Sequence, residues 1–280
     1  MAGLTDRPDA PPSADSVPIL HRDSYGNVEI WICRTDAERI FSGAFWNDEE
    51  AERGKEWWIA DGDDRNLLEH LDELNAHEAF AITTDALRNS GRLGGRVLDA
   101  GAGTCWSAAL WSRLPEINRI DAVEFSWHRI STLAGPTIDA LHGLPEKICR
   151  IFGSFTDIRR RDGTYDIISM AAAFHHCSEP ATLIAELDRC LAPAGAIVLI
   201  GEEPVGAASI VRRFAANLIK RGKLCLSFAA LFPPHPKIGD HYYRRQDYKR
   251  LFAAAGFAVR FLPVGRSNVA IIATRNGEQA

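Results

Sequence analysis

Three groups of side chains in the chain could bind a cofactor and act on a proton. The segment 99–104 (DAGAGT) combines a carboxylate with two glycines, Glu124 follows it, and His175 and His176 are adjacent. Glycines let a ligand approach the backbone closely, and an acidic residue about 20 positions further on suits the hydroxyls of a ribose. An imidazole, with its unperturbed pKa near 6.5, can accept a proton. These residue types predict a nucleoside pocket beside a general base.

Buried strands and helices must bring these groups together. Positions 97–98 end an apolar strand, a helical pattern begins near Ala108, and 120–123 form a second strand closed by Glu124. A strand that turns sharply into a helix aims backbone N–H groups at a ligand. The third, fourth and fifth strands are expected at 147–152, 165–170 and 196–200, and an antiparallel hairpin at 257–264 and 268–274.

The glycine turn departs from the dinucleotide-binding pattern. Gly101 and Gly103 match G-x-G-x-x-G, but Trp106 occupies the third glycine position, where close helix–strand packing is needed. Asp99 would repel a pyrophosphate and would suit a cation. A nicotinamide-dependent oxidoreductase is therefore disfavoured, and S-adenosylmethionine, which carries a sulfonium and an ammonium, is favoured.

The segment 97–104 (VLDAGAGT) resembles motif I of the class I S-adenosylmethionine-dependent methyltransferases, although the family commonly has glycine in place of Cys105. The resemblance extends from Gly95 to about Thr274. It implies an α/β fold with a Rossmann-like, doubly wound, seven-stranded sheet whose last strand is antiparallel. It also implies S-adenosylmethionine as the cofactor.

The resemblance assigns expected roles to individual residues. The segment after the third strand usually contacts adenine, which points to Ser154 and Phe155. His175 and His176 follow the fourth strand, where small-molecule methyltransferases often carry a histidine pair, so both are the catalytic candidates and no metal ligands are expected. Glu202 and Glu203 could bind a cationic substrate, but their interpretation as solvated loop acids is favoured. The predicted cofactor contacts are Asp99, Gly101, Gly103, Glu124, Ser154, Phe155 and Met170.

Outside the resemblance, the chain divides by composition. Residues 1–17 are rich in Pro, Ala, Asp and Ser and are expected to be disordered. Residues 18–92 form an extension with a hairpin and helices, which either packs on the main domain or caps the active site. The methyltransferase domain spans 93–280, with an insertion at 205–240 before the last helix. The insertion is basic and apolar, and a packed helix is favoured over a membrane-surface helix.

Composition excludes several classes of protein. The net charge of −5 does not suggest binding to nucleic acid, which is itself negatively charged. No apolar run reaches the length of a membrane span. The six cysteines form no C-x-x-C pair, so no zinc site or disulfide framework is indicated. A cytoplasmic protein with a small-molecule partner and without stable membrane association is expected, and formation of a homodimer stays open.

The favoured function is methyl transfer to an O, N or C nucleophile of a small molecule. Residues 171–174 (AAAF) lack the Asn/Asp-Pro-Pro-Tyr/Phe motif that the family's amino-group methylases of bases carry after the fourth strand. Two alternatives remain. One is cyclisation or aminocarboxypropyl transfer, which releases methylthioadenosine from the same cofactor. The other is a cofactor-binding scaffold without catalysis.

Overall fold

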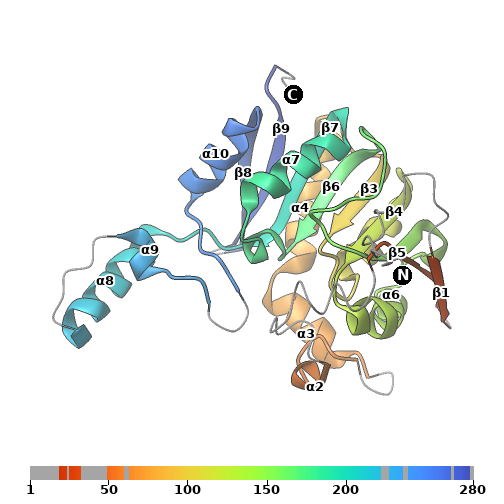
Figure 1. Ribbon diagram of the computed structural model, residues 1–280, viewed down its shortest axis with the longest axis horizontal. Coiled ribbons are helices and arrows are strands. Elements are labelled where there is room, and N and C mark those ends of the chain that lie inside the picture. Colours follow the sequence, from red (N-terminus) through yellow and green to blue (C-terminus); the bar gives the residue numbers. More distant parts are fainter. Residues whose placement is uncertain are drawn as a thin grey trace, which may run out of the picture.

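Figure 1 shows a computed structural model of the chain, which describes residues 19–23, 25–32, 49–59, 63–221, 227–235, 239–265 and 268–277. The tail predicted at 1–17 lies outside these residues. The strands are β1 (Ile19–Asp23), β2 (Gly26–Ile30), β3 (Gly95–Ala100), β4 (Ile117–Glu124), β5 (Ile148–Phe152), β6 (Tyr165–Ala171), β7 (Leu191–Glu202), β8 (Phe257–Val264) and β9 (Asn268–Arg275). The helices are α2 (Glu49–Glu52), α3 (Arg65–Glu73), α4 (Ala76–Asn89), α5 (Trp106–Ser112), α6 (Ala134–Ala140), α7 (Pro180–Cys190), α8 (Ala207–Arg221), α9 (Phe228–Leu231) and α10 (Arg245–Ala254).

All strands join one sheet in the order β1-β2-β5-β4-β3-β6-β7-β9-β8. The pairings from β2 to β7 are parallel, and β9 runs antiparallel to both β7 and β8. Strands β3 to β9 are the seven strands predicted, with the antiparallel last strand among them. The sheet has two more strands, because the N-terminal hairpin adds β2 to the free edge of β5, where Val28 lies opposite Arg150.

Helices cover both faces of the sheet, as a doubly wound fold requires (Figure 1). One apolar core lies under α4, α5 and α6, and the second lies under α7 and α10. In α7, the apolar positions recur at helical spacing and Leu183 and Leu187 are fully buried. Pro180 stands in the first turn of this helix, where its missing N–H leaves no bond unmade.

The segment after β4 differs from the sequence prediction. The sequence pattern of residues 126–142 predicts a helix interrupted near Gly135 and Pro136, but a π-helix over Arg129–Leu133 leads directly into α6. Pro136 lies within the first turn of α6, directly after the π-helix, and has no N–H to donate to the preceding helical turn. The change of helical pitch therefore comes before Gly135, and the proline does not break the helix.

The insertion before the last helix forms α8 and α9, which extend away from the sheet (Figure 1). Val211 and Ile219 on α8 are exposed, and Arg213 stacks over the ring of Phe232 beyond α9. In the part of the chain that the structure describes, none of the helices has both the length and the apolar character needed to cross a bilayer.

Candidate active site

A cavity of about 820 Å³ opens where β3, β4, β6 and β7 end. The turn after β3 forms one wall, the turn after β6 forms another, and both the N-terminal extension and the insertion contribute side chains. The extension contributes the lining residues Trp57, Leu67, His70, Leu71 and Leu74. The sheet edge and the segments that follow its strands contribute Gly101, Gly103, Trp106, Glu124, Phe155, His175, His176, Glu202 and Glu203. The insertion and the region of α10 contribute Ser209, Arg212, Arg213, Phe232, Asp240, Tyr243 and Tyr248.

The glycine turn needs its glycines for two different reasons. Gly101 has φ +75°, and a Cβ there would lie 2.8 Å from the Cβ of Ala173 across the cavity floor. Gly103 has φ +55°, but a Cβ there would meet only the end of the Arg129 side chain at 3.7 Å. Cys105 also adopts a positive φ, +66°, at the position where the family commonly carries glycine. A cysteine in this left-handed region carries backbone strain that glycine avoids.

The amides of the turn are used within the protein. The N–H groups of Gly101 and Ala102 both donate to the carbonyl of Val123, at 2.9 and 3.0 Å. The N–H of Gly103 donates to Oε2 of Glu124 at 2.8 Å. The expectation that this turn aims its backbone N–H groups at a ligand is therefore wrong for these three amides. A pyrophosphate would lack these donors and would face a carboxylate, whereas a cationic ligand suits the site.

Glu124 lies at the tip of β4 with its carboxylate directed to the cavity. Its Oε1 accepts the N–H of Ser126 at 2.8 Å, in addition to the bond from Gly103. Burial raises the pKa of Glu124, and the nearby Arg129 opposes this shift. Each carboxylate oxygen can accept more than one hydrogen bond, so Glu124 can still receive the hydroxyls of a ribose.

Asp99 lies away from the cavity. Its side chain is fully buried, and Ser107 donates a hydrogen bond to Oδ2 at 2.6 Å. Burial raises the pKa of Asp99 to about 7, against the hydrogen bonds from Ser107 and the Ala108 amide. These contacts place the carboxylate under the first turn of α5, so the structure does not support direct contact between Asp99 and a cofactor.

Two other predicted cofactor contacts also lie off the cavity. Met170 is fully buried in the core under α7 and α10. Ser154 is half-buried, and its hydroxyl lies 2.8 Å from that of Thr156. Phe155, which follows Ser154, does line the cavity, together with Gly101, Gly103 and Glu124. Met170 packs on one face of β6, whereas Ala171 on the opposite face and Ala172, beyond the end of the strand, line the cavity.

His175 is held by a buried carboxylate. Its Nδ1 lies 3.2 Å from Oε1 of Glu202, and the Tyr248 hydroxyl donates to Oε2 of Glu202 at 2.6 Å. Burial is the largest single effect and lowers the pKa of His175, but the charge and hydrogen bond of Glu202, together with the charges of Asp240 and Glu203, raise the pKa overall. For Glu202, burial is the largest single effect and raises the pKa, but His175, the Tyr248 hydroxyl and His176 together lower the pKa overall. The interpretation of Glu202 as a solvated loop acid is wrong, since its side chain is only 1% exposed.

His176 faces a carboxylate from the insertion. Its Nδ1 lies 2.9 Å from Oδ1 of Asp240, and both side chains are about one-fifth exposed at the cavity. Burial lowers the pKa of His176, against the opposing effect of Asp240. Next to Asp240, the N–H of His241 donates to the carbonyl of His175 at 2.7 Å. This backbone bond fixes the end of the insertion against the histidine pair.

A buried ion pair joins the N-terminal extension to the cavity wall. Glu52 of α2 is completely buried and pairs with both His128 and Arg129. Arg129 lines the cavity, and its guanidinium lies 5.3 Å from the ring centre of Trp57. The extension therefore contributes both lining side chains and the carboxylate that positions Arg129.

Comparison with known proteins decides the family. The methyltransferase domain family matches residues 65–261, well over half of the chain. The chain belongs to the class I S-adenosylmethionine-dependent methyltransferases. S-adenosylmethionine is thus its cofactor, and methyl transfer is its reaction. None of the curated proteins matches this methyltransferase.

Solved structures show the same fold at low sequence identity. A SAM-dependent methyltransferase from Leishmania major is 17% identical, with a TM-score of 0.55 over 98% of this chain and 99% of its own. DhpI, solved as a complex with SAH, is 12% identical, with a TM-score of 0.52 over 76% and 90%. The mitomycin 7-O-methyltransferase MmcR is 18% identical, with a TM-score of 0.51 over 86% and 66%. At these low identities, the three structures show that the methyltransferase shares their fold.

Several residues of the cavity are absent from the sequence prediction. Asp240 and Tyr248 lie far along the chain from the histidine pair that they support. Glu52 lies in the extension, where a run of acidic residues gives no indication of which carboxylate is buried. Only the tertiary fold brings Asp240 and Tyr248 to the cavity and places Glu52 against Arg129, which lines the cavity.

Proposed function

We propose that this methyltransferase transfers the methyl group of S-adenosylmethionine to a hydroxyl oxygen of a small molecule. The observation that carries this proposal is the His175–Glu202 contact of 3.2 Å in the same cavity as the glycine turn and Glu124. A neutral hydroxyl is a weak nucleophile that needs a base, and this pair supplies one. The cavity volume of about 820 Å³ is in the range that suits a cofactor with a small acceptor.

The residues that line the cavity near the glycine turn support an assignment of each part of the cofactor. We assign Glu124 to the ribose hydroxyls, Phe155 to one face of the adenine, and Gly101 with Gly103 to the methionine part of the cofactor. These four residues border one continuous cavity. Asp99 has a supporting role in this proposal, because it holds the first turn of α5 behind the glycine turn.

Methyl transfer to a hydroxyl requires that the acceptor oxygen be positioned in line with the methyl group and that a nearby group accept its proton. The sulfonium makes the methyl carbon electrophilic, so the acceptor oxygen must lie about 3 Å away and in line with the C–S bond. Nε2 of His175 takes the hydroxyl proton while Glu202 stabilises the imidazolium. The oxygen attacks the methyl carbon, the C–S bond breaks, and S-adenosylhomocysteine leaves. Side chains of the extension (residues 18–92) and of the insertion cap the cavity and exclude water.

Product analysis tests this function. The full chain is incubated with S-adenosylmethionine and a panel of phenols, hydroxy acids and amines, and the products are identified by mass spectrometry. The proposal predicts S-adenosylhomocysteine together with an O-methylated product, and loss of both with the double substitution His175→Ala and His176→Ala. Release of methylthioadenosine would instead indicate cyclisation or aminocarboxypropyl transfer. Cofactor binding without turnover on any acceptor would indicate a scaffold.

A further inference from the structure

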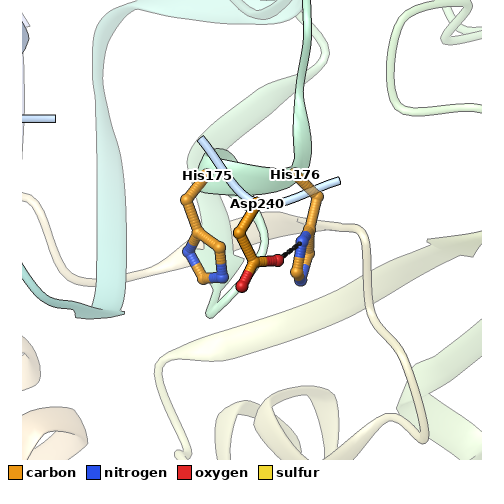
Figure 2. A group of neighbouring side chains, drawn as sticks. All are labelled: His175, His176 and Asp240. Atoms are coloured by element: carbon orange, nitrogen blue, oxygen red, sulfur yellow. Dashed lines mark ion pairs between the residues drawn. The ribbon is translucent and has the colours of Figure 1, made fainter. Parts of the chain in front are cut away.

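We propose that His175, His176 and Asp240 bind one divalent first-row transition-metal ion, and that this ion binds the acceptor hydroxyl. This inference rests on the proposed function and adds how the acceptor is activated when the ion is present. Each of the three residues offers one ligand atom, and the three atoms lie within 4.8 Å of one another. Figure 2 shows the Asp240 carboxylate between the two imidazole rings.

The spacing is close to that of a metal site. Nδ1 of His176 lies 2.9 Å from Oδ1 of Asp240, and two ligands each about 2.1 Å from a metal ion lie roughly 3 to 3.5 Å apart in tetrahedral geometry. Small rotations of the three side chains would bring the remaining ligand atom into range. The ligands border the cavity, so an ion among them would have access to the acceptor.

The backbone that carries the ligands is well fixed. His175 and His176 lie on a single helical turn, Phe174–His176, which begins shortly after the end of β6 at Ala171. Asp240 comes from the end of the insertion, and the bond from the His241 N–H to the His175 carbonyl ties the two segments together. A site on such fixed elements loses little conformational freedom when the ion binds.

His175 has the partner that a metal-binding histidine usually has. Its Nδ1 contacts Glu202, which is buried and accepts a hydrogen bond from Tyr248. In metal sites, a carboxylate behind the imidazole fixes the tautomer and leaves the other ring nitrogen for the ion. Nε2 of His175 is that nitrogen, so in the loaded site it holds the ion in place of the acceptor proton.

The ligand types select the metal. Two imidazole nitrogens with one carboxylate oxygen suit Zn²⁺, Fe²⁺, Co²⁺ or Ni²⁺ and do not suit Mg²⁺ or Ca²⁺, which prefer oxygen ligands. Three protein ligands leave a position for the acceptor oxygen. The ion lowers the pKa of the bound hydroxyl, which releases its proton to solvent. The oxygen then attacks the methyl carbon, the C–S bond breaks, and the products are a methyl ether and S-adenosylhomocysteine.

Co²⁺ titration of the full chain, freed of any affinity tag and treated with chelator, tests the site. Calorimetry and the visible absorption of bound Co²⁺ should show one ion per chain. Asp240→Asn and His176→Ala should each lower Co²⁺ affinity by at least about 100-fold, and Glu202→Gln by about 10- to 100-fold. His77→Ala removes an exposed histidine of α4 and should leave the affinity unchanged. S-adenosylhomocysteine binding checks that every variant is folded.

The outcomes separate this inference from the proposed function. The metal site is overturned if the wild-type chain binds no Co²⁺, or if binding survives both Asp240→Asn and His176→Ala. It is also overturned if Co²⁺ leaves the O-methylation rate of the metal-free chain unchanged, and in that case the proposed function stands. Specific Co²⁺ binding without turnover on any hydroxyl acceptor would instead contradict the proposed function and leave the metal site in place.

Discussion

The N–H of Gly103 donates a 2.8 Å hydrogen bond to the carboxylate of Glu124, so the tip of β4 fixes the turn at the tip of β3. The second oxygen of Glu124 accepts the N–H of Ser126 at the same distance. Two backbone donors therefore hold the carboxylate at the cavity wall before a ligand arrives. The two sequence features that point to a nucleoside pocket, the glycine turn and the acid after it, are parts of one hydrogen-bonded unit.

Replacement of Gly101 by Ala should destabilise the protein by about 2 to 5 kcal/mol. The positive φ of +75° accounts for about 1 to 2 kcal/mol of this loss, and overpacking against Ala173 accounts for a further 1 to 3 kcal/mol or so. Urea unfolding measures the change. Gly103→Ala is the matched control, because it introduces the same strain without the contact and should lose only about 1 to 2 kcal/mol. Equal losses in the two variants would contradict the packing argument at Gly101.

Burial of Asp99 should make the stability of the wild-type protein depend on pH. The pKa of Asp99 is about 7 in the folded protein and 3.8 ordinarily. Between these values the folded state holds a proton that the unfolded state has lost, so the contribution of Asp99 to stability falls as pH rises from about 4 to about 7. Asp99→Asn should flatten this part of the profile and make the protein more stable than wild type at pH 8. Urea unfolding at several pH values gives both curves.

The same variant tests the placement of Asp99. Because the side chain lies under α5 and away from the cavity, Asp99→Asn should change the affinity for S-adenosylhomocysteine by less than about threefold, roughly 0.7 kcal/mol. A loss as large as that expected for a ribose contact would show that the carboxylate acts on the ligand.

The parts of the fold that sequence could predict are those coded by local patterns. Apolar runs such as 120–123 and 165–170 and the glycine turn locate individual strands, and the family resemblance implies the doubly wound sheet that they form. The same patterns cannot say which way a side chain points at a strand end. Asp99 and Met170 therefore have the expected positions along the chain, while their side chains turn into the protein interior.

Removal of the Glu52 carboxylate should be strongly destabilising. Glu52→Ala leaves Arg129 and His128 without the buried carboxylate that both contact, and loss of one partner in such a buried group costs about 3 to 5 kcal/mol. Thermal and urea unfolding measure this loss. Glu50→Ala, on the same short helix, removes an 82% exposed side chain and should change stability by less than about 0.5 kcal/mol. Similar values for both variants would show that α2 does not depend on the buried ion pair.

At position 105, replacement of the cysteine by glycine should give a more stable protein than replacement by alanine. The φ of +66° at Cys105 favours glycine, which usually is less stabilising than alanine in ordered structure. Both substitutions remove the buried sulfur, so the difference between Cys105→Gly and Cys105→Ala reports mainly the backbone. We expect the glycine variant to be more stable than the alanine variant by about 1 kcal/mol in urea unfolding. The opposite order would show that the turn relaxes out of the left-handed region.

In the acceptor half of the cavity, the sequence predicts the histidine pair but not the residues that contact it. His175 and His176 can be singled out because they lie shortly after a predicted strand. Their partners Asp240 and Tyr248 come from the insertion and from α10, and no spacing rule connects these segments. Long-range packing of this kind depends on the whole fold, whereas the cofactor turn is contained in one strand–turn–helix unit.

Calorimetric titration with S-adenosylhomocysteine tests the cofactor site most directly, with the wild-type chain, Glu124→Ala and the exposed-site control Glu78→Ala measured in parallel. The wild type and Glu78→Ala should bind one ligand per chain with the same affinity. Glu124→Ala should bind about 10- to 100-fold more weakly, because hydrogen bonds to a charged group contribute about 1.5 to 3 kcal/mol. A folded Glu124→Ala protein that binds as tightly as the wild type would contradict the assignment of this cavity as the cofactor site.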